Sequence, residues 1–490
     1  MIQGLKLVEY EEYGLERWFN YHSYISKLNM QAVNSAQTNS DEFVKEYFIA
    51  NDKLTLIVHD LIALELWQQK VFHHLIERQE EPSSTFPVYT ILYHELIVAN
   101  LLETLTFHMD AMEALNDSAV DLADWCYRSL CYLVTNFSTE DDKTDYLRKK
   151  DEIEADSNLK DLQRQQRVIS FDKAMKAISI LRHLIDHSLS ANSVLPLGVG
   201  RRLLETNDVT LLLCQLIEQS PWYGVAKNKE TGKPCQMVWH ESGIWIPAEQ
   251  MTSSLGKAEG QIWLSLFQIL LANQSSLRYD CSATHRRTAL LRLRSHLTED
   301  KLDAIPVLAD LRRFLEHLSM SPNAACNNGG SGVAGACLVE LLPEIRDGLC
   351  RKYAKKWKQL AIDFFDRIES DRGKQAARRA AAQWTETFSV DHLDKLFSNF
   401  GEGELGQANP YGGPARCAVC GGPAVKRCSR CRSEWYCRRE CQVKHWPKHK
   451  KACDLMSDAI GTEQNNPKVY ATSRRSSTCR AVALPAESPR

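Results

Sequence analysis

The sequence predicts an all-α fold, in which an irregular helical body is followed by a small, cysteine-rich module near the C-terminus. Two observations support this prediction. From residue 54 to about residue 388, apolar side chains recur with the spacing of an α-helix, and strand-like alternation is confined to one short segment. Seven of the 16 cysteines fall within residues 416–453, and this density indicates a separate module.

Two apolar stripes show the helical period clearly. Residues 171–185 place Phe171, Ile178 and Leu181 on one face, with lysine and arginine on the other. Residues 349–365 repeat this arrangement. The same period marks further stretches at 54–76, 90–109, 120–134, 209–217, 260–271, 288–297 and 307–318. Helices of this length joined by short polar loops are typical of an all-α body.

The body shows no clear residue-level repeat of fixed length. The spacing of its helices suits degenerate armadillo-like pairs, and a single irregular helical domain fits almost as well. Residues 236–250 break the helical period, because alternating Met237 and Trp239 precede a Ser-Gly pair and Ile244 and Ile246 follow it. This pattern predicts a short hairpin, and a tryptophan-rich loop packed on the body is the alternative.

Shifts in composition place the domain boundaries. Densely charged and glycine-rich stretches predict loops or linkers, and a stretch rich in Ser, Thr and Pro without apolar period predicts disorder. The expected parts are a helical body at 1–398, with a flexible loop or exposed helix at 139–167 and a flexible loop at 325–336, a Gly-rich hinge at 399–414, the cysteine module at 415–453 and a disordered tail at 454–490.

The composition is that of a folded globular protein, with 490 residues of which 44% are hydrophobic and 25% charged. Apolar runs such as 262–272 are far shorter than the roughly 20 residues that span a bilayer. The first 18 residues carry four glutamates and no apolar signal segment. We therefore expect no membrane span, and a cytosolic or nuclear protein in which disulfides are rare.

Eight candidate zinc ligands come in four closely spaced pairs, which are Cys417-x2-Cys420, Cys428-x2-Cys431, Cys437-x3-Cys441 and His449-x3-Cys453. Eight is the number that two tetrahedral Zn²⁺ ions require, and full coordination by protein describes a structural site rather than a catalytic one. So short a segment buries too little apolar surface to fold alone, so zinc must supply folding energy. Spacing leaves the pairing open, because sequential and interleaved arrangements both satisfy it.

The cysteine module is also strongly basic. Residues 416–453 hold eleven Lys or Arg against two Glu, a formal charge of +9 in a chain of net charge −2, and seven thiolates with two Zn²⁺ reduce it to +6. This positive charge could bind the phosphates of a nucleic acid. The module lacks, however, the spacing of zinc fingers in which a helix follows a hairpin and enters the major groove of DNA. We therefore expect a protein partner rather than nucleic acid, with Arg438 and Arg439 contacting its acidic residues.

The module resembles the MYND zinc finger, whose pattern ends in C-x3-C-Q and then W, H and C. The matching residues are Cys437, Cys441, Gln442, Trp446, His449 and Cys453. Because the ligands of that family interleave, the resemblance implies one zinc on Cys417, Cys420, Cys437 and Cys441 and a second on Cys428, Cys431, His449 and Cys453. It also implies a finger that binds short proline-containing peptides, with Gln442 and Trp446 in the contact.

Short stretches of the body, together with the finger, resemble the MYND-finger axonemal dynein assembly factors. The stretches are 28–32, 66–72, 85–89, 100–104, 260–271 and 426–446. The resemblance implies a non-enzymatic co-chaperone for cytoplasmic preassembly of the dynein arms of motile cilia. The implied partners are a leucine-rich-repeat dynein assembly factor, heat-shock chaperones and co-chaperones, and dynein intermediate and heavy chains. The implied location is the cytoplasm, near the centrosome, the centriolar satellites or the ciliary base.

The sequence shows no catalytic motif, so we expect no catalytic residues. His94 and Glu95 begin like a zinc-protease helix, but Val98 stands where the second histidine is needed. Two alternatives remain at this point. One is a nuclear transcriptional co-regulator that binds co-repressor peptides through the finger, and the other is an enzyme whose site tertiary structure assembles.

Overall fold

The computed structural model describes residues 2–151, 157–227, 234–240, 243–251, 255–273, 277–320, 341–387, 417–420, 422, 424, 426–428, 434–447, 449–450 and 453. Contacts divide the chain into two units, Met1–Ala377 and Arg378–Arg490. The predicted loop 325–336, hinge 399–414 and tail 454–490 lie outside the described residues. Within the described ranges, no helix has both the length and the apolar character that a membrane crossing requires.

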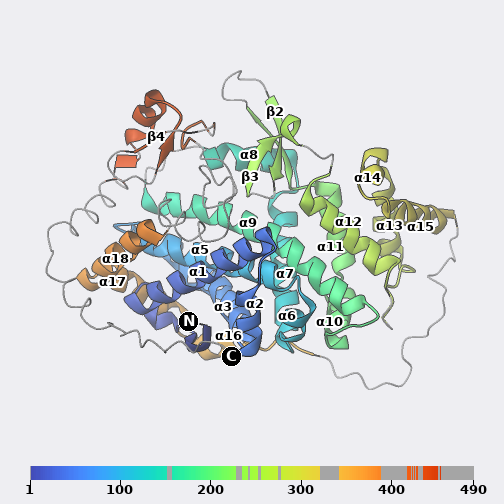
Figure 1. Ribbon diagram of the computed structural model, residues 1–490, viewed down its shortest axis with the longest axis horizontal. Coiled ribbons are helices and arrows are strands. Elements are labelled where there is room, and N and C mark those ends of the chain that lie inside the picture. The colour runs from blue at the N-terminus through green and yellow to red at the C-terminus, as the bar shows by residue number, and fades with distance from the viewer. Residues whose placement is uncertain are drawn as a thin grey trace, which may run out of the picture. The chain divides into compact units, whose positions relative to one another are not determined.

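The first half of unit 1 consists of helices joined by short turns (Figure 1). They are η1 (Ile2–Gly4), η2 (Tyr10–Glu12), α1 (Glu16–Thr38), α2 (Phe43–Ala50), α3 (Leu54–Trp67), η3 (Gln68–Phe72), α4 (His73–Glu77), α5 (Phe86–Leu105), α6 (Met109–Glu113), α7 (Ser118–Asn136), α8 (Glu140–Asp151) and α9 (Asn158–Leu189). Most side chains of α3 and α5 are buried, which is typical of helices that other helices surround.

Helix α9 is the centre of unit 1. It begins after Ser157, whose hydroxyl accepts a hydrogen bond from a backbone N–H of the first turn at 3.2 Å. Its apolar face, with Phe171, Ile178 and Leu181 buried, packs against α5, α7 and, further along the chain, α12 (Lys257–Leu270). Because each such side chain contributes about 1.5–3 kcal/mol on burial, this contact is a major source of the unit's stability.

A three-stranded antiparallel sheet interrupts the helices, in the order β1 (Tyr223–Lys227), β2 (Pro234–His240) and β3 (Ile244–Pro247). Strands β2 and β3 lie where the sequence predicts a hairpin, whereas β1 is an additional strand. Trp239 and Trp245 pair directly across the hairpin, with ring centroids 6.3 and 5.5 Å from the Phe171 ring. The two tryptophans therefore attach the sheet to α9.

The second half of unit 1 continues the helical packing. Its remaining elements are α10 (Leu197–Arg201), η4 (Arg202–Thr206), α11 (Val209–Gln219), η5 (Ala248–Gln250), α13 (Thr284–Arg292), η6 (Leu293–His296), α14 (Glu299–Ala304) and α15 (Leu308–Met320). Helix α11 contacts α7, α12 and α13, so it joins the central helices to this later group.

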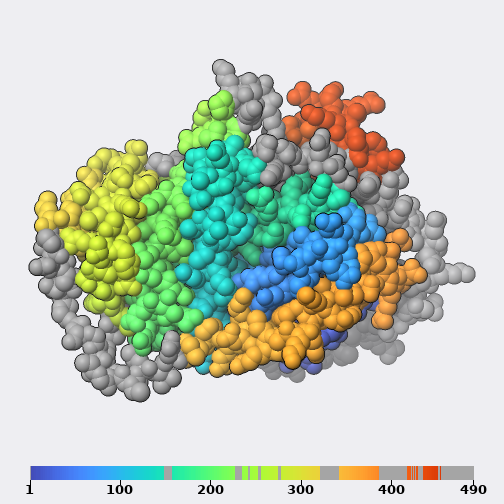
Figure 2. Space-filling model, turned by 180° about the vertical axis from the view of Figure 1, so that it is seen from behind, coloured from blue at the N-terminus to red at the C-terminus, as the bar shows by residue number. Residues whose placement is uncertain are grey.

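Helices α16 (Ile345–Tyr353) and α17 (Trp357–Glu369) return to the N-terminal elements. Helix α16 contacts α3 and α7, and α17 contacts η2, η3 and α4. Figure 2 shows this segment, in orange, lying across the blue N-terminal helices. Aromatic rings form much of the contact, because the centroids of Tyr353 and Trp357 lie 4.9 and 5.6 Å from that of Tyr10. Helix α18 (Asp371–Thr387) follows and crosses the boundary between the units.

Buried polar groups within unit 1 bind one another. His94, which has no exposed surface, lies with Nδ1 2.8 Å from Nδ1 of His22 and with Nε2 3.3 Å from Asp60 Oδ2. The Tyr21 hydroxyl donates to the same Asp60 oxygen at 2.9 Å. These partners give His94 a structural role in the core.

The structure confirms the predicted class, an irregular all-α body with a C-terminal finger. In its described residues, segment 139–167 is helical rather than a flexible loop, because it contains α8 and the beginning of α9. This part of the chain is also not simply exposed, since Tyr146 and Leu147 are buried and α8 packs on β1. Two apolar side chains in an otherwise charged run therefore anchor α8.

Candidate metal centre

The finger in unit 2 is built on a two-stranded hairpin followed by a helix. Strand β4 (Lys426–Arg427) pairs antiparallel with β5 (Trp435–Tyr436), and residues 439–447 are helical. Backbone hydrogen bonds fix the ligands around this hairpin. Cys428 N–H donates to the Glu434 carbonyl at 2.9 Å, and Cys417 N–H donates to the Gly422 carbonyl at 2.8 Å.

The first ligand group joins the first and third cysteine pairs. The sulfur atoms of Cys417, Cys420, Cys437 and Cys441 all lie within 4.8 Å of one another. The Sγ–Sγ distance is 3.4 Å between Cys420 and Cys437 and 3.5 Å between Cys437 and Cys441. A disulfide would need about 2.05 Å, whereas the edge of a ZnS₄ tetrahedron with Zn–S bonds of about 2.3 Å is about 3.8 Å. The spacing fits a tetrahedral metal site.

The second ligand group contains Cys428, His449 and Cys453, all buried, with their ligand atoms within 4.8 Å of one another. The sulfurs of Cys428 and Cys453 are 3.7 Å apart, again close to a tetrahedral edge. The fourth predicted ligand, Cys431, lies outside the described residues. The spacing allows two pairings of the ligands. The described ligands are grouped as in the interleaved pairing, in which Cys428 is separate from the first group.

The protonation of these ligands suits a cation. Burial alone raises the pKa of Cys417, but backbone N–H groups of Cys437, Cys420 and Val419 reverse this and lower it to about 6. The pKa of Cys441 rises to about 12, first because of its hydrogen bond with Cys437 and further because of the neighbouring thiolates. Four sulfurs this close cannot all ionise without a positive charge between them, and Zn²⁺ supplies that charge.

The apolar centre of the finger is small. Tyr436 is 1% exposed, and the half-buried side chains of Trp435 and Trp446 pack against the same cluster. The Tyr436 hydroxyl lies 2.9 Å from His445 Nδ1, and the His445 ring stacks on that of His449. His445 therefore packs against the histidine of the second metal group and belongs to neither ligand group.

The predicted partner-binding residues lie beside the ligands. Arg438 and Arg439 are exposed directly after Cys437, and Gln442 is half-buried, with its backbone N–H donating to the Arg438 carbonyl at 3.3 Å. Trp446, also half-buried, packs against the cluster one turn of helix further on. Arg439, Gln442 and Trp446 thus lie on the helix that carries Cys441, and Arg438 directly precedes it. Their use by a partner is a prediction.

The two ligand groups, the hairpin and the basic helix define this module as a zinc finger with two structural zinc ions. Residues 417–453 match the family model described as MYND finger, so the chain carries a MYND-type finger. The similarity extends beyond the finger. The chain is 29% identical over 466 residues to the zinc finger MYND domain-containing protein 10 homolog of Drosophila melanogaster, covering 92% of this chain and 96% of that protein. The predicted resemblance to a MYND-finger protein, over most of the chain, is thereby confirmed.

Two further relatives match over short segments, each about as long as the finger. Ubiquitin C-terminal hydrolase 15 of Oryza sativa subsp. japonica is 55% identical over 38 residues, 8% of this chain and 4% of that protein. Dauer abnormal formation protein 25 of Caenorhabditis elegans is 51% identical over 41 residues, 8% of this chain and 10% of that protein. No solved structure matches the chain. These two similarities are thus short, whereas the similarity to the Drosophila protein includes most of the body.

Proposed function

We propose that this protein is a non-enzymatic adaptor, a co-chaperone in the cytoplasmic preassembly of the axonemal dynein arms of motile cilia. The observation that best supports the proposal is the extent of the Drosophila similarity, which includes body and finger together. The similarity to the hydrolase covers only 8% of this chain and 4% of that protein and therefore supports no shared activity. The stretches that resemble the dynein assembly factors are spread over the same full length.

The adaptor role assigns one class of partner to each unit. A MYND finger is a protein-binding module, and Arg438 and Arg439 give this one a cationic surface for acidic residues. We assign the leucine-rich-repeat assembly factor to the finger, and heat-shock chaperones with dynein intermediate and heavy chains to the body. Holding two partners on one chain raises the effective concentration of each for the other, which promotes assembly without a chemical step.

The chemistry of the cysteines supports a role without catalysis. Zinc that is fully coordinated by protein has no open position for substrate. In the body, burial raises the pKa of the Cys126 and Cys214 thiols far above neutral, so both remain protonated and poorly nucleophilic. These thiols act as small core residues.

The test is an affinity purification from ciliated cells, with every bound protein identified. The native chain is compared with Cys428→Ser, which removes a zinc ligand, and with Cys235→Ser, the same change at a half-buried cysteine of β2. We expect chaperones and dynein chains with the native chain and with Cys235→Ser, and loss of the finger's partner with Cys428→Ser. Recovery of chromatin proteins in place of dynein chains would overturn the proposal in favour of a nuclear co-regulator.

A further inference from the structure

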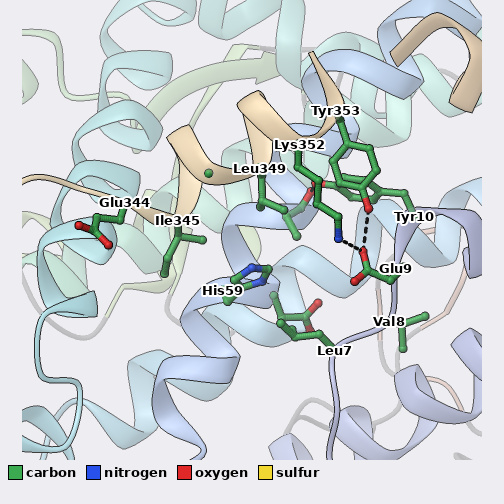
Figure 3. A pocket seen from close by; sticks show the side chains of 13 residues that line it. Leu7, Val8, Glu9, Tyr10, His59, Glu344, Ile345, Leu349, Lys352 and Tyr353 are labelled. Carbon is green, nitrogen blue, oxygen red and sulfur yellow. Dashed lines mark hydrogen bonds and ion pairs between the residues drawn. The ribbon is translucent and has the colours of Figure 1, made fainter. Parts of the chain in front are cut away.

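Unit 1 contains a half-open cavity of about 330 Å³ that the zinc finger does not form. Three segments far apart in the sequence surround it: the N-terminal stretch at Leu7–Tyr10, the middle of α3 at His59–Ala63, and α16 with the residue before it (Figure 3). This volume lies at the lower end of the range of about 300–1,000 Å³ typical of ligand pockets. It is therefore suited to a single long side chain rather than to a large cofactor.

The cavity combines apolar walls with an excess of negative charge. Leu7, Ile345 and Leu349 line it from two sides. Its charged lining residues are three carboxylates, Glu9, Asp60 and Glu344, against the single ammonium group of Lys352. The pKa of His59 is lowered, because burial outweighs the carboxylates nearby, so this imidazole is neutral and adds no positive charge at pH 7. An apolar stem with a cationic end complements such a lining.

Two polar groups at the cavity have unused hydrogen-bonding capacity. Lys352 Nζ and the Tyr353 hydroxyl both donate to Glu9 Oε2, at 2.6 and 2.7 Å, and no described residue donates to Glu9 Oε1. The Nδ1 atom of His59 is buried and has no hydrogen-bond partner among the described residues. A buried nitrogen without a partner carries a cost that a ligand can remove.

Gly348 keeps the cavity open. It lies in the interior of α16, where glycine costs roughly 1 kcal/mol relative to alanine. A Cβ at this position would meet no heavy atom within 4 Å, so packing does not require glycine here. The missing side chain instead leaves free the space between α16, α3 and the N-terminal stretch.

We propose that this cavity binds an aliphatic side chain that ends in a cation, as in a lysine or arginine of a partner protein. The stem lies on Leu7, Ile345 and Leu349, and the cation lies at Glu9 opposite Lys352. The site is separate from the finger and does not depend on the proposed function in dynein assembly.

The test uses three probes with the same six-carbon chain, which are n-hexylamine, n-hexanol and hexanoate. Each is titrated into the full-length, zinc-loaded protein at pH 7, and binding is followed by ligand-observed NMR. We expect n-hexylamine to bind in about the millimolar range, as suits so small a ligand, and at least about tenfold more tightly than n-hexanol. Hexanoate should not bind, and tighter binding of hexanoate than of n-hexylamine would overturn the proposal.

Two variants locate the binding. Gly348→Leu places a side chain in the cavity and should abolish binding of all probes without lowering the melting temperature, since leucine favours the helix. Gly256→Leu is the matched control, because a Cβ there also meets nothing within 4 Å, outside the cavity.

The second variant, Glu9→Gln, removes one charge. It should bring the affinities for n-hexylamine and n-hexanol to within about threefold of each other. Unchanged n-hexylamine binding in Gly348→Leu, or an unchanged preference in Glu9→Gln, would overturn the assignment.

Discussion

The helical body and the zinc finger of this chain are stabilised by different kinds of interaction. The body buries aromatic and aliphatic side chains on many helices, with Trp125 and Phe171 completely inaccessible. In the described part of the finger, the buried cluster consists of Cys417, Ala424, Cys428, Tyr436 and Cys453, of which three are cysteines of the two ligand groups. The core of the finger is therefore largely its metal sites.

Because of this difference, the two regions should respond to different perturbations. The body should respond to the loss of apolar contacts and the finger to the loss of zinc. Burial of apolar surface needs no cofactor and stabilises the body at any zinc concentration. The finger has too little such surface, so its folding free energy is mainly the free energy of metal binding. Each of the following predictions changes one region and states what should be measured.

Removal of zinc will have the largest effect, and it will be confined to the finger. Structural zinc contributes on the order of 10–16 kcal/mol per ion in peptide models, so a strong chelator should unfold residues 417–453. Hydrogen exchange measured by mass spectrometry should show complete exchange there and unchanged protection in α5, α7 and α9. Cys428→Ser should reproduce the result with less zinc bound. Retention of two zinc ions by that variant would contradict it.

Phe171→Ala will destabilise the body without releasing zinc. The ring is fully buried and contacts the sheet tryptophans, so its loss should cost about 3–5 kcal/mol in the free energy of unfolding. Denaturant unfolding measures this value, and metal analysis of the native state should still find two zinc ions. Phe43→Ala, at a phenylalanine that is 53% exposed, is the control and should change stability far less. Zinc loss in Phe171→Ala would show that the regions are coupled.

Acidification will weaken the body through His183. Burial lowers the pKa of His183 from 6.5 to about 4, so between these values the unfolded chain binds a proton that the folded chain does not. Its contribution to stability is complete above pH 6.5 and is lost as the pH falls towards 4, a change of up to about 3 kcal/mol. Urea unfolding at pH 7 and pH 4.5 should show a smaller difference for His183→Gln. The exposed His73→Gln should behave as the native chain, and a slope that His183→Gln leaves intact would refute the assignment.

Charge reversal at Arg438 and Arg439 will have the smallest effect on stability. Both side chains are exposed, so the double change to glutamate should alter stability by less than about 0.5 kcal/mol and leave both zinc ions bound. Capture of the finger's partner should nevertheless weaken, mainly through slower association. Arg313→Glu, at an exposed arginine of α15, is the control. Equal partner capture by the native and reversed chains would exclude this surface as the binding site.

The sequence predicted best those regions where one physical requirement dominates. The helices with continuous apolar faces, such as α9, follow directly from the hydrophobic period. The ligand residues of the finger follow from paired spacing, because tetrahedral zinc requires that arrangement. The ligand pairing did not follow from spacing, since it depends on how the β4–β5 hairpin separates Cys428 from Cys417 and Cys420.

Features without a clear hydrophobic period or ligand spacing were not predicted from the sequence. Helix α1 lies in the predicted helical body, but its position was not predicted. Its buried face includes His22, Ser26 and Ser35, which interrupt the apolar period and form hydrogen bonds to a tertiary partner or within the helix. Strand β1 has only five residues, YGVAK, too few to show a clear alternation of apolar and polar side chains. The cavity was not visible in the sequence because Glu9, His59 and Gly348 meet only in the folded chain.

The return of α16 and α17 to the N-terminal elements has a consequence for synthesis on the ribosome. Tyr10 and Trp67 emerge early, whereas Tyr353 and Phe364, whose rings cover them, are translated almost 300 residues or more later. At about 5–20 residues per second, this delay is on the order of 15–70 s, during which the aromatic surface of the nascent chain stays uncovered. A premature stop before Ile345 makes that exposure permanent, so such truncated chains should be retained by chaperones and degraded even though most of the helices are present.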